Sequence, residues 1–341
     1  MIRCTARLSS PPRLQVSAVG SNLKASWQLE IIYRLHRPTH LDNRADRSIA
    51  SSIATTMRLE MRSLSTLVGT SLLLGLASAV TPISNNDMTT LLNAGGVDLA
   101  VAAAPMWFFG QSQNQPPCYP TNATNAQGQQ TPAAALCNHP NVGCHCRNPG
   151  VPITNAGPAF PVYYTYQQCN AAEIRVAYNL FYEKDGVNPA GTFGHAYDWE
   201  RVIVIWAQQG DTTWVPSKLM LSQHSGYQTL SWADIQNTFN TADAGLPRGG
   251  DNGLQNRDHA KVYVAWSKHA NYNTRNTGWN DVLSQQLGNA FRSQDWWYFP
   301  TRGDYLRADR STTLGSTIAG YNWGDATSYP ALVHDTLCSA S

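Results

Sequence analysis

The chain has 341 residues, of which 42% are hydrophobic and only 13% are charged, and its formal net charge at pH 7 is +2. This composition is typical of a folded globular protein and excludes an intrinsically disordered one. The positive balance comes from the N-terminal part, because residues 80–341 hold 14 Lys and Arg against 18 Asp and Glu, a formal charge of −4. The main part of the chain therefore lacks the basic surface of a nucleic-acid-binding protein, and we expect no nucleic-acid partner.

The first 79 residues are expected to lie outside the fold. Residues 61–79 have a basic start, an apolar run and an Ala-Ser-Ala end, which is the layout of a secretory signal peptide cleaved after Ala79. The apolar run is too short for a permanent transmembrane helix. Residues 1–60 are rich in Arg and Ser and lack periodicity, so they are assigned to an N-terminal extension. The sequence thus predicts one secreted, extracellular and monomeric domain over residues 80–341.

Six cysteines follow the predicted cleavage site, and an even number in an exported chain implies disulfide bonds. Their pairing is left open. A zinc site that uses His139 is the disfavoured alternative, because its spacing fits no common zinc finger. One N-glycosylation sequon begins at Asn122, in a polar stretch. The six disulfide candidates are Cys118, Cys137, Cys144, Cys146, Cys169 and Cys338, of which Cys137, Cys144 and Cys146 would form the zinc site with His139.

The predicted elements change in character along the chain. Residues 84–105 read as a short helix with its lead-in, and residues 111–160, rich in Pro, Gln, Asn and Cys, as a loop region held by disulfides. From residue 161 onward the hydrophobic pattern is mostly of period two. It predicts a mainly β fold, a disulfide-stabilised β-sandwich with flanking helices, because regular strand–helix alternation is missing. The predicted strands are 174–185, 198–206, 217–224 and 261–269, and the predicted helices are 277–293 and 325–338.

One histidine and three carboxylates stand where the first two predicted strands meet. If these strands form a hairpin, Asp185 ends one strand where His195, Asp198 and Glu200 begin the next. Asp198 and Glu200 are two residues apart and so face the same side of a strand. His195 has the opposite parity, and we expect it to come from the turn, where Gly194 permits the bend.

Three carboxylates and one imidazole form an oxygen-rich site. A divalent cation bound there would offset the repulsion among the carboxylates. Mg²⁺ or Ca²⁺ is the expected ion, with Mn²⁺ as a further candidate, since zinc or iron would favour more nitrogen ligands. Two alternatives stay open at this stage. The acids could pair with Arg201 and Lys184, or His195 could be a structural histidine.

A second polar group follows the predicted strand 261–269, where the sequence AWSKHANYN places Lys268 and His269. Strand parity would point His269 away from Lys268. His269 could complete the cation site or bind a ligand beside it. The lone histidines His224 and His259 are interpreted as structural.

The sequence resembles the necrosis- and ethylene-inducing peptide-like proteins (the NLP or NPP1 family). GHAYDWE looks like the family heptapeptide Gly-His-Arg-His-Asp-Trp-Glu, and NLFYEKD resembles the strand that ends in Lys-Asp. VYVAWSKHANY resembles the later Lys-His segment, NWGDATSYPALVHDTLCSA the C-terminal Trp-Gly-x-Ala segment, and PCYP the first cysteine. The resemblance covers residues 84–340.

This resemblance implies an actinoporin-like β-sandwich and a secreted, non-enzymatic effector. Members bind a divalent cation and the sugar head groups of plant plasma-membrane sphingolipids (glycosylinositol phosphorylceramides), and cytotoxic members permeabilise membranes of dicotyledonous plants and trigger cell death and immunity. The resemblance places the cation ligands on Asp185, His195, Asp198 and Glu200, and the later His, near the head-group site, on His269. Trp199 and Lys268 are further candidate ligand-binding residues.

Two positions depart from the heptapeptide, because Ala196 and Tyr197 replace the family's Arg and second His. These departures favour an alternative, a non-cytolytic relative that acts as an adhesive or immunogenic binding protein. A secreted metal-dependent hydrolase, with Asp198 or Glu200 as general base, is a further alternative. A metal-free glycoside hydrolase is disfavoured, because two acids on one face of one strand cannot easily straddle a glycosidic bond.

Overall fold

The computed structural model describes residues 80–187, 193–224, 226–238, 257–275 and 295–341, all within one unit, Ala77–Ser341. The predicted N-terminal extension, signal peptide and helix 277–293 fall outside these residues and stay predictions. The strands are β1 (Ile83–Ser84), β2 (Met106–Phe109), β3 (Val162–Asn170), β4 (Glu173–Val187), β5 (Phe193–Gln209), β6 (Thr213–Gln223), β7 (Gly226–Ser231), β8 (Asn237–Thr238), β9 (His259–Val264), β10 (Asn271–Tyr272), β11 (Trp296–Tyr298) and β12 (Tyr305–Arg307). The α-helices are α2 (Asn85–Asn93), α3 (Val97–Ala102), α5 (Thr313–Ala319) and α6 (Pro330–Asp335).

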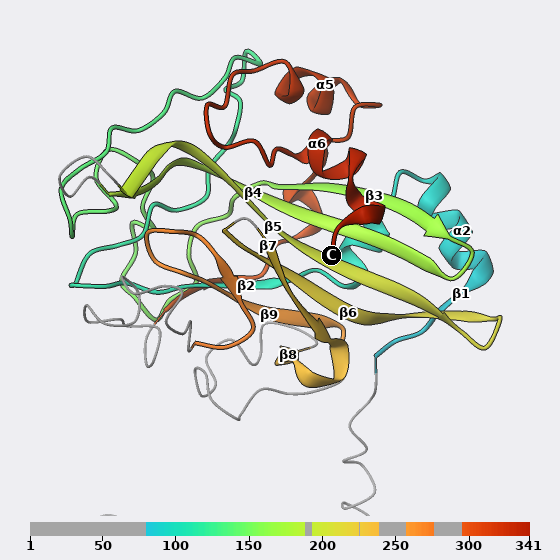
Figure 1. Cartoon of the computed structure of the whole chain (residues 1–341). Coiled ribbons are helices and arrows are strands. Elements are labelled where there is room, and N and C mark those ends of the chain that lie inside the picture. The colour runs from blue at the N-terminus through green and yellow to red at the C-terminus, as the bar shows by residue number, and fades with distance from the viewer. Residues whose placement is uncertain (1–79, 188–192, 225, 239–256, 276–294) are drawn as a thin grey trace, which may run out of the picture. The chain divides into compact units, whose positions relative to one another are not determined.

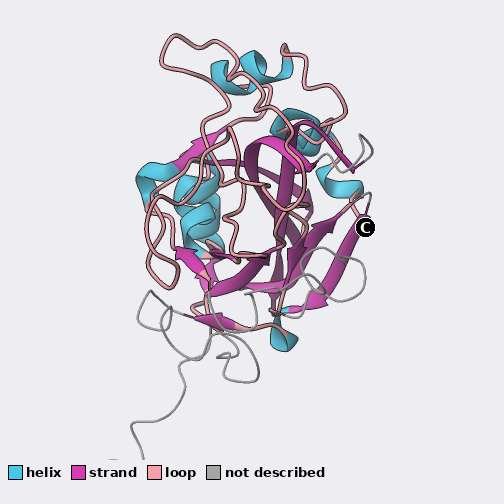
Figure 2. Ribbon diagram, turned by 90° about the vertical axis from the view of Figure 1, so that its left-hand side faces the viewer, coloured by secondary structure: helices cyan, strands magenta, loops and turns pink. Residues whose placement is uncertain are grey.

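These strands form two sheets, so the predicted mainly β sandwich class is confirmed. The larger sheet has the order β1-β6-β5-β4-β3-β12 with β7 beside β6, and the smaller has the order β10-β9-β2-β11 with β8 beside β9. Figure 1 shows β3 to β6 as long neighbouring ribbons, and Figure 2 shows the helices outside the strands. The main core fills the space between the sheets, since it combines Trp107 and Val262 of the smaller sheet with Tyr178 and Val204 of the larger one.

The antiparallel run β3 to β6 confirms the period-two interpretation of this region. Alternate residues of β4 and β5, such as Val176 and Val204, point into the main core. The opposite faces pack elsewhere: Ala177 and Ile203 meet α6 and the C-terminal turn. The central strands are therefore covered on both sides, and only their ends can carry a polar site.

The N-terminal helices confirm the prediction for residues 84–105. Ser84 caps α2, because its hydroxyl accepts a hydrogen bond from the Asp87 amide. Gly96, with φ of 75°, separates α2 from α3. A Cβ at Gly96 would lie 2.3 Å from the Tyr166 ring, so only glycine fits both the left-handed backbone and the packing.

Three disulfides join the six predicted cysteines: Cys118–Cys146, Cys137–Cys144 and Cys169–Cys338. The Cys169–Cys338 disulfide links the C-terminal segment to β3. In the described part of residues 111–160 there is no helix or extended strand, as predicted, and two of the disulfides hold this region.

Two predicted elements are shorter than expected. Helix α6 covers only Pro330–Asp335 of the predicted 325–338, because residues 324–325 form a turn and residues 326–329 are irregular ahead of its first residue, Pro330. Strand β9 ends at Val264 and not at residue 269. Across the described residues we find no helix with the length and apolar character needed to span a bilayer.

Candidate functional site

The β4–β5 hairpin brings the predicted ligands to one end of the larger sheet. Asp185 is paired with His195 across the two strands, Tyr182 with Asp198, and Leu180 with Glu200. β6 stays beside β5 only as far as the Val202↔Leu221 pair. The stretch of β5 that carries the acids therefore lies at an edge of the sheet, where side chains can line a pocket.

His195 belongs to strand β5, so the prediction that it comes from the turn is wrong. The left-handed residue in this stretch is Tyr197, with φ of 60°, and not Gly194. A single left-handed residue interrupts the alternation of faces along a strand. As a result His195 and Asp198 face one cluster despite their spacing of three: His195 Nε2 lies 3.5 Å from Asp185 Oδ2.

His269 reaches the same cluster from a turn that follows β9. Ser267 and His269 both have positive φ, 80° and 53°, and the Ala265 amide bonds to the Ala270 carbonyl. Since β9 ends at Val264, the parity argument for His269 fails. The ring is 1% exposed and stacks in parallel on Tyr182, with ring centroids 3.7 Å apart.

Among the described residues, Asp185, Asp198 and His269 form a cluster of candidate metal ligands, whose ligand atoms all lie within 4.8 Å of one another. His269 Nδ1 is 2.8 Å from Asp198 Oδ2 and 3.9 Å from Asp185 Oδ1. Asp185 Oδ1 is buried and makes no hydrogen bond to any described residue. Buried oxygens normally have partners, so this atom fits a ligand position for a cation.

Glu200 lines the same pocket and has partners of its own. It is buried, and its Oε2 accepts a hydrogen bond from the Ser222 hydroxyl. Ser222 also receives a bond from the Asn271 side-chain amide, 3.1 Å away. Residues of β6 and β10 thus hold the Glu200 side chain.

Burial shapes the protonation of this cluster. The pKa of Asp198 is raised well above its usual value, first by burial and then by the charge of Asp185. The pKa of Glu200 is raised by burial and then by the charge of Asp198. Burial lowers the pKa of His269 to about 4. Burial therefore favours the neutral forms of Asp198, Glu200 and His269.

The alternative in which Lys184 neutralises the acids is wrong, because this side chain points to the other side of β4. Its Nζ lies 2.9 Å from the Ala135 carbonyl oxygen and 3.0 Å from Cys144 Sγ. Arg201 donates from Nε to the Tyr227 hydroxyl, 2.5 Å away, and its guanidinium lies over that ring. Lys268 is the cation beside the cluster, with Nζ 3.8 Å from Asp185 Oδ2.

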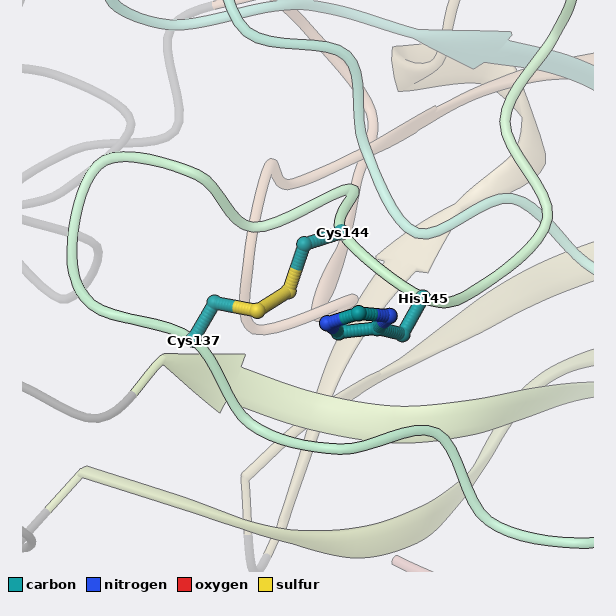
Figure 3. Close-up of side chains that lie close together, drawn as sticks. All are labelled: Cys137, Cys144 and His145. Carbon is teal, nitrogen blue, oxygen red and sulfur yellow. A yellow bond between two sulfur atoms is a disulfide. The ribbon is translucent and has the colours of Figure 1, made fainter.

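The zinc alternative is also excluded by the disulfides. Figure 3 shows the Cys137–Cys144 disulfide beside His145. Cys146 is bonded to Cys118. Because a disulfide offers no thiolate, these cysteines cannot act as zinc ligands.

A pocket of about 450 Å³ opens over the cluster. It is lined by the four predicted ligands, by Trp199, Arg201, His224 and Lys268, and by residues 325–328. His224, which the sequence analysis interprets as structural, lines this pocket. Its backbone is left-handed, with φ of 55°. His259 is structural as predicted: its ring bonds to the Ala104 carbonyl and packs on Phe299.

Trp199 contributes to the pocket wall from inside the core. The residue is 2% exposed and packs on Tyr163, Phe181 and Trp323. These aromatic side chains enclose most of its ring, and the predicted binding role of Trp199 stays a prediction. The glycosylation prediction at Asn122 falls on an exposed residue and stays a prediction.

Comparison with known proteins gives one family and several solved structures. Residues 108–247 match the family described as "Necrosis inducing protein (NPP1)", which confirms the resemblance found in the sequence. "NLPPya in complex with glucosamine" is 18% identical, with 72% of this chain and 89% of that chain covered and a TM-score of 0.42. "Toxin fold for microbial attack and plant defense" is 18% identical, with 78% and 96% covered and a TM-score of 0.41. The "non-toxic HaNLP3 protein" is 16% identical, with 67% and 83% covered and a TM-score of 0.37. None of the curated proteins matches the chain.

Proposed function

With the necrosis inducing protein (NPP1) family established for residues 108–247, we propose that the chain is a secreted, cation-dependent binder of sphingolipid head groups in plant plasma membranes. The observation that carries the proposal is the cluster of Asp185, Asp198 and His269, of which the two acids line a polar pocket and His269 is buried beside them. The predicted head-group ligand, glycosylinositol phosphorylceramide, is rich in hydroxyls that can complete the coordination of a bound cation.

Asp185, His195, Asp198 and Glu200 would hold the cation, with His269 beside Asp198 as a further ligand. Carboxylate oxygens favour Mg²⁺ or Ca²⁺, and the nearby imidazoles also suit Mn²⁺. Burial, and then repulsion between the acids, raises the pKa of Asp198 and Glu200, and a bound divalent ion would offset both effects. Lys268 lies at the rim, where its charge can attract the head-group phosphate.

The departures from the family heptapeptide support a second candidate, a non-cytolytic relative. Ala196 is exposed at the position of the family's Arg, so this position carries no positive charge. Tyr197, at the position of the second His, packs edge-on against Trp323. Binding without lysis, as an adhesive or immunogenic protein, is consistent with both replacements.

A non-enzymatic role is favoured over hydrolysis. One oxygen of each acid proposed as general base is engaged, Asp198 Oδ2 with His269 and Glu200 Oε2 with Ser222, and a bound cation would take up further lone pairs of both. A general base needs a lone pair directed at a water or a substrate. Turnover of a glycan or phosphodiester by the purified protein would contradict this part of the proposal.

Vesicle sedimentation tests the proposed function. The protein should bind vesicles that contain glycosylinositol phosphorylceramide in the presence of Mg²⁺, should leave them when EDTA is added, and should not bind phosphatidylcholine vesicles. Release of an encapsulated dye separates lysis from binding alone. Binding that persists in excess chelator would contradict cation dependence.

Cation binding is expected to release protons. Because the pKa of Asp198 is raised, a proton leaves when the ion binds, and affinity should fall by up to about tenfold per released proton for each pH unit below that pKa. Calorimetric titrations of Mg²⁺ in two buffers of different ionisation enthalpy, at one pH, measure this number. An observed enthalpy that is equal in both buffers would show that the acids are already ionised.

A further inference from the structure

Lys184 is a fully buried lysine of β4, and its amine contacts the segment of residues 135–144. Its Nζ lies 2.9 Å from the Ala135 carbonyl oxygen, 2.5 Å from the Cys144 carbonyl oxygen and 3.0 Å from Cys144 Sγ. An ammonium has three N–H donors and no acceptor, so these three partners match it fully. The positive charge of Lys184 therefore lies against one sulfur of the Cys137–Cys144 disulfide.

The same disulfide is accessible to small molecules. Cys137 and Cys144 are half-buried, and His145, the next residue, is exposed. A ring nitrogen of His145 and the two sulfur atoms lie within 4.8 Å of one another. Figure 3 shows the imidazole beside the disulfide. A small reagent can thus reach the sulfurs at the surface, while Lys184 holds Cys144 from the buried side.

The Cys169–Cys338 disulfide has a different environment. Its cysteines are also half-buried, but its sulfurs lie beside oxygen atoms of Gln167. Cys169 Sγ is 3.9 Å from the Gln167 carbonyl oxygen, and Cys338 Sγ is 3.2 Å from Gln167 Oε1. Oxygen lone pairs repel a thiolate, whereas an ammonium stabilises one. Exposure does not distinguish these two disulfides, but the charge beside Cys144 does.

We propose that Cys137 is a modification site for low-molecular-weight thiols of the glutathione class, with Cys144 as the leaving group. The thiolate of the small molecule attacks Cys137 Sγ, a mixed disulfide forms there, and the Cys137–Cys144 bond breaks. The electron pair of that bond stays on Cys144 Sγ, which leaves as a thiolate and accepts a hydrogen bond from Lys184. The sulfur of the small thiol is oxidised and that of Cys144 is reduced, so the step needs no other reactant. Because a stabilised thiolate leaves faster, the ammonium directs the attack to Cys137.

The modification should leave the fold in place. Lys184 continues to hold the Ala135 and Cys144 carbonyls, and the Ala134 amide bonds to the Glu183 carbonyl, so the segment stays attached to β4. The disulfide closes a loop with a sequence separation of only 7, and such short loops add less to stability than long ones. The inference does not depend on the proposed function, because it requires neither a cation nor a head group.

Exchange with reduced glutathione at pH 7 tests the proposal on the unaltered protein. The reaction is quenched with acid, the free thiols are alkylated, and the modified cysteines are mapped by mass spectrometry. We expect Cys137–Cys144 to open before Cys169–Cys338. In the opened molecules, glutathione should be on Cys137 and the alkyl group on Cys144.

Lys184→Gln should slow this opening by about 3- to 10-fold, because it removes the charge that stabilises the leaving thiolate. Lys218→Gln, at an exposed position of β6, is the matched control and should keep the rate of the unaltered protein. Circular dichroism of both variants verifies that they are folded.

Three results would overturn the proposal. They are glutathione shared equally between Cys137 and Cys144, earlier opening of Cys169–Cys338, and an unchanged rate in folded Lys184→Gln. If Lys184→Gln does not fold, the distribution of glutathione between the two sulfurs of the unaltered protein decides by itself.

Discussion

Replacing Asp198 with asparagine is expected to weaken divalent cation binding by about 100-fold or more, because it removes a buried charged ligand while preserving side-chain shape. Asp198 is the acid that contacts His269, and its oxygen lies within the cluster of candidate ligands. Calorimetric titration of Mg²⁺ and of Ca²⁺ into the purified protein measures the effect.

Asp211→Asn is the control for this substitution. Asp211 lies in the exposed β5–β6 turn with φ of 55°, a conformation that asparagine adopts readily. It should leave cation affinity unchanged. If Asp198→Asn is folded and binds the ions as tightly as the unaltered protein, the acids at the hairpin end have a purely structural role.

Trp199→Ala is expected to lower the free energy of unfolding by about 3–5 kcal/mol, the usual cost of removing a large buried ring. Trp199 lies between the two acids in sequence, and its ring fills the space between β3, β4 and the 323–326 segment. Urea unfolding followed by circular dichroism gives the value, and Trp199→Phe, which keeps an aromatic ring in place, should recover a large part of the loss.

Trp199→Ala should also loosen residues 325–328 beside the pocket, since Ala326 shares the aromatic cluster with Trp199. A loss of stability below about 1 kcal/mol would indicate that the ring is exposed and available for a surface role. The tryptophan of the heptapeptide would then act at a membrane and not in the core.

The hairpin that carries the site follows directly from the sequence, because period-two hydrophobicity gives both strands and their register brings Asp185 to His195. The orientation of His195 could not be predicted, since a left-handed backbone at Tyr197 is unusual for a residue with a large side chain. The sequence analysis placed the bend at Gly194, because glycine adopts left-handed conformations most easily.

Long-range packing accounts for the other differences. The sequence AWSKHANYN looks like a strand end, but Ser267 and His269 adopt positive φ because the turn packs against β4, where the Gly186 amide bonds to the Ser267 carbonyl. His224 and residues 325–328 carry no local signal for a pocket. Tertiary packing brings them to the pocket. His224 follows β6, which lies beside β5, and Ala326 packs in the aromatic cluster that contains Trp199.

The separation of the cluster along the chain has a consequence for folding kinetics. Asp185 and Asp198 come from one hairpin, whose strands are close in sequence, whereas His269 depends on β9, which pairs in parallel with β2 about 150 residues earlier. Local pairings form faster than distant ones, because loop closure costs less entropy. The two acids should therefore assemble before the histidine arrives, and a cation present during refolding would meet a two-carboxylate half-site first.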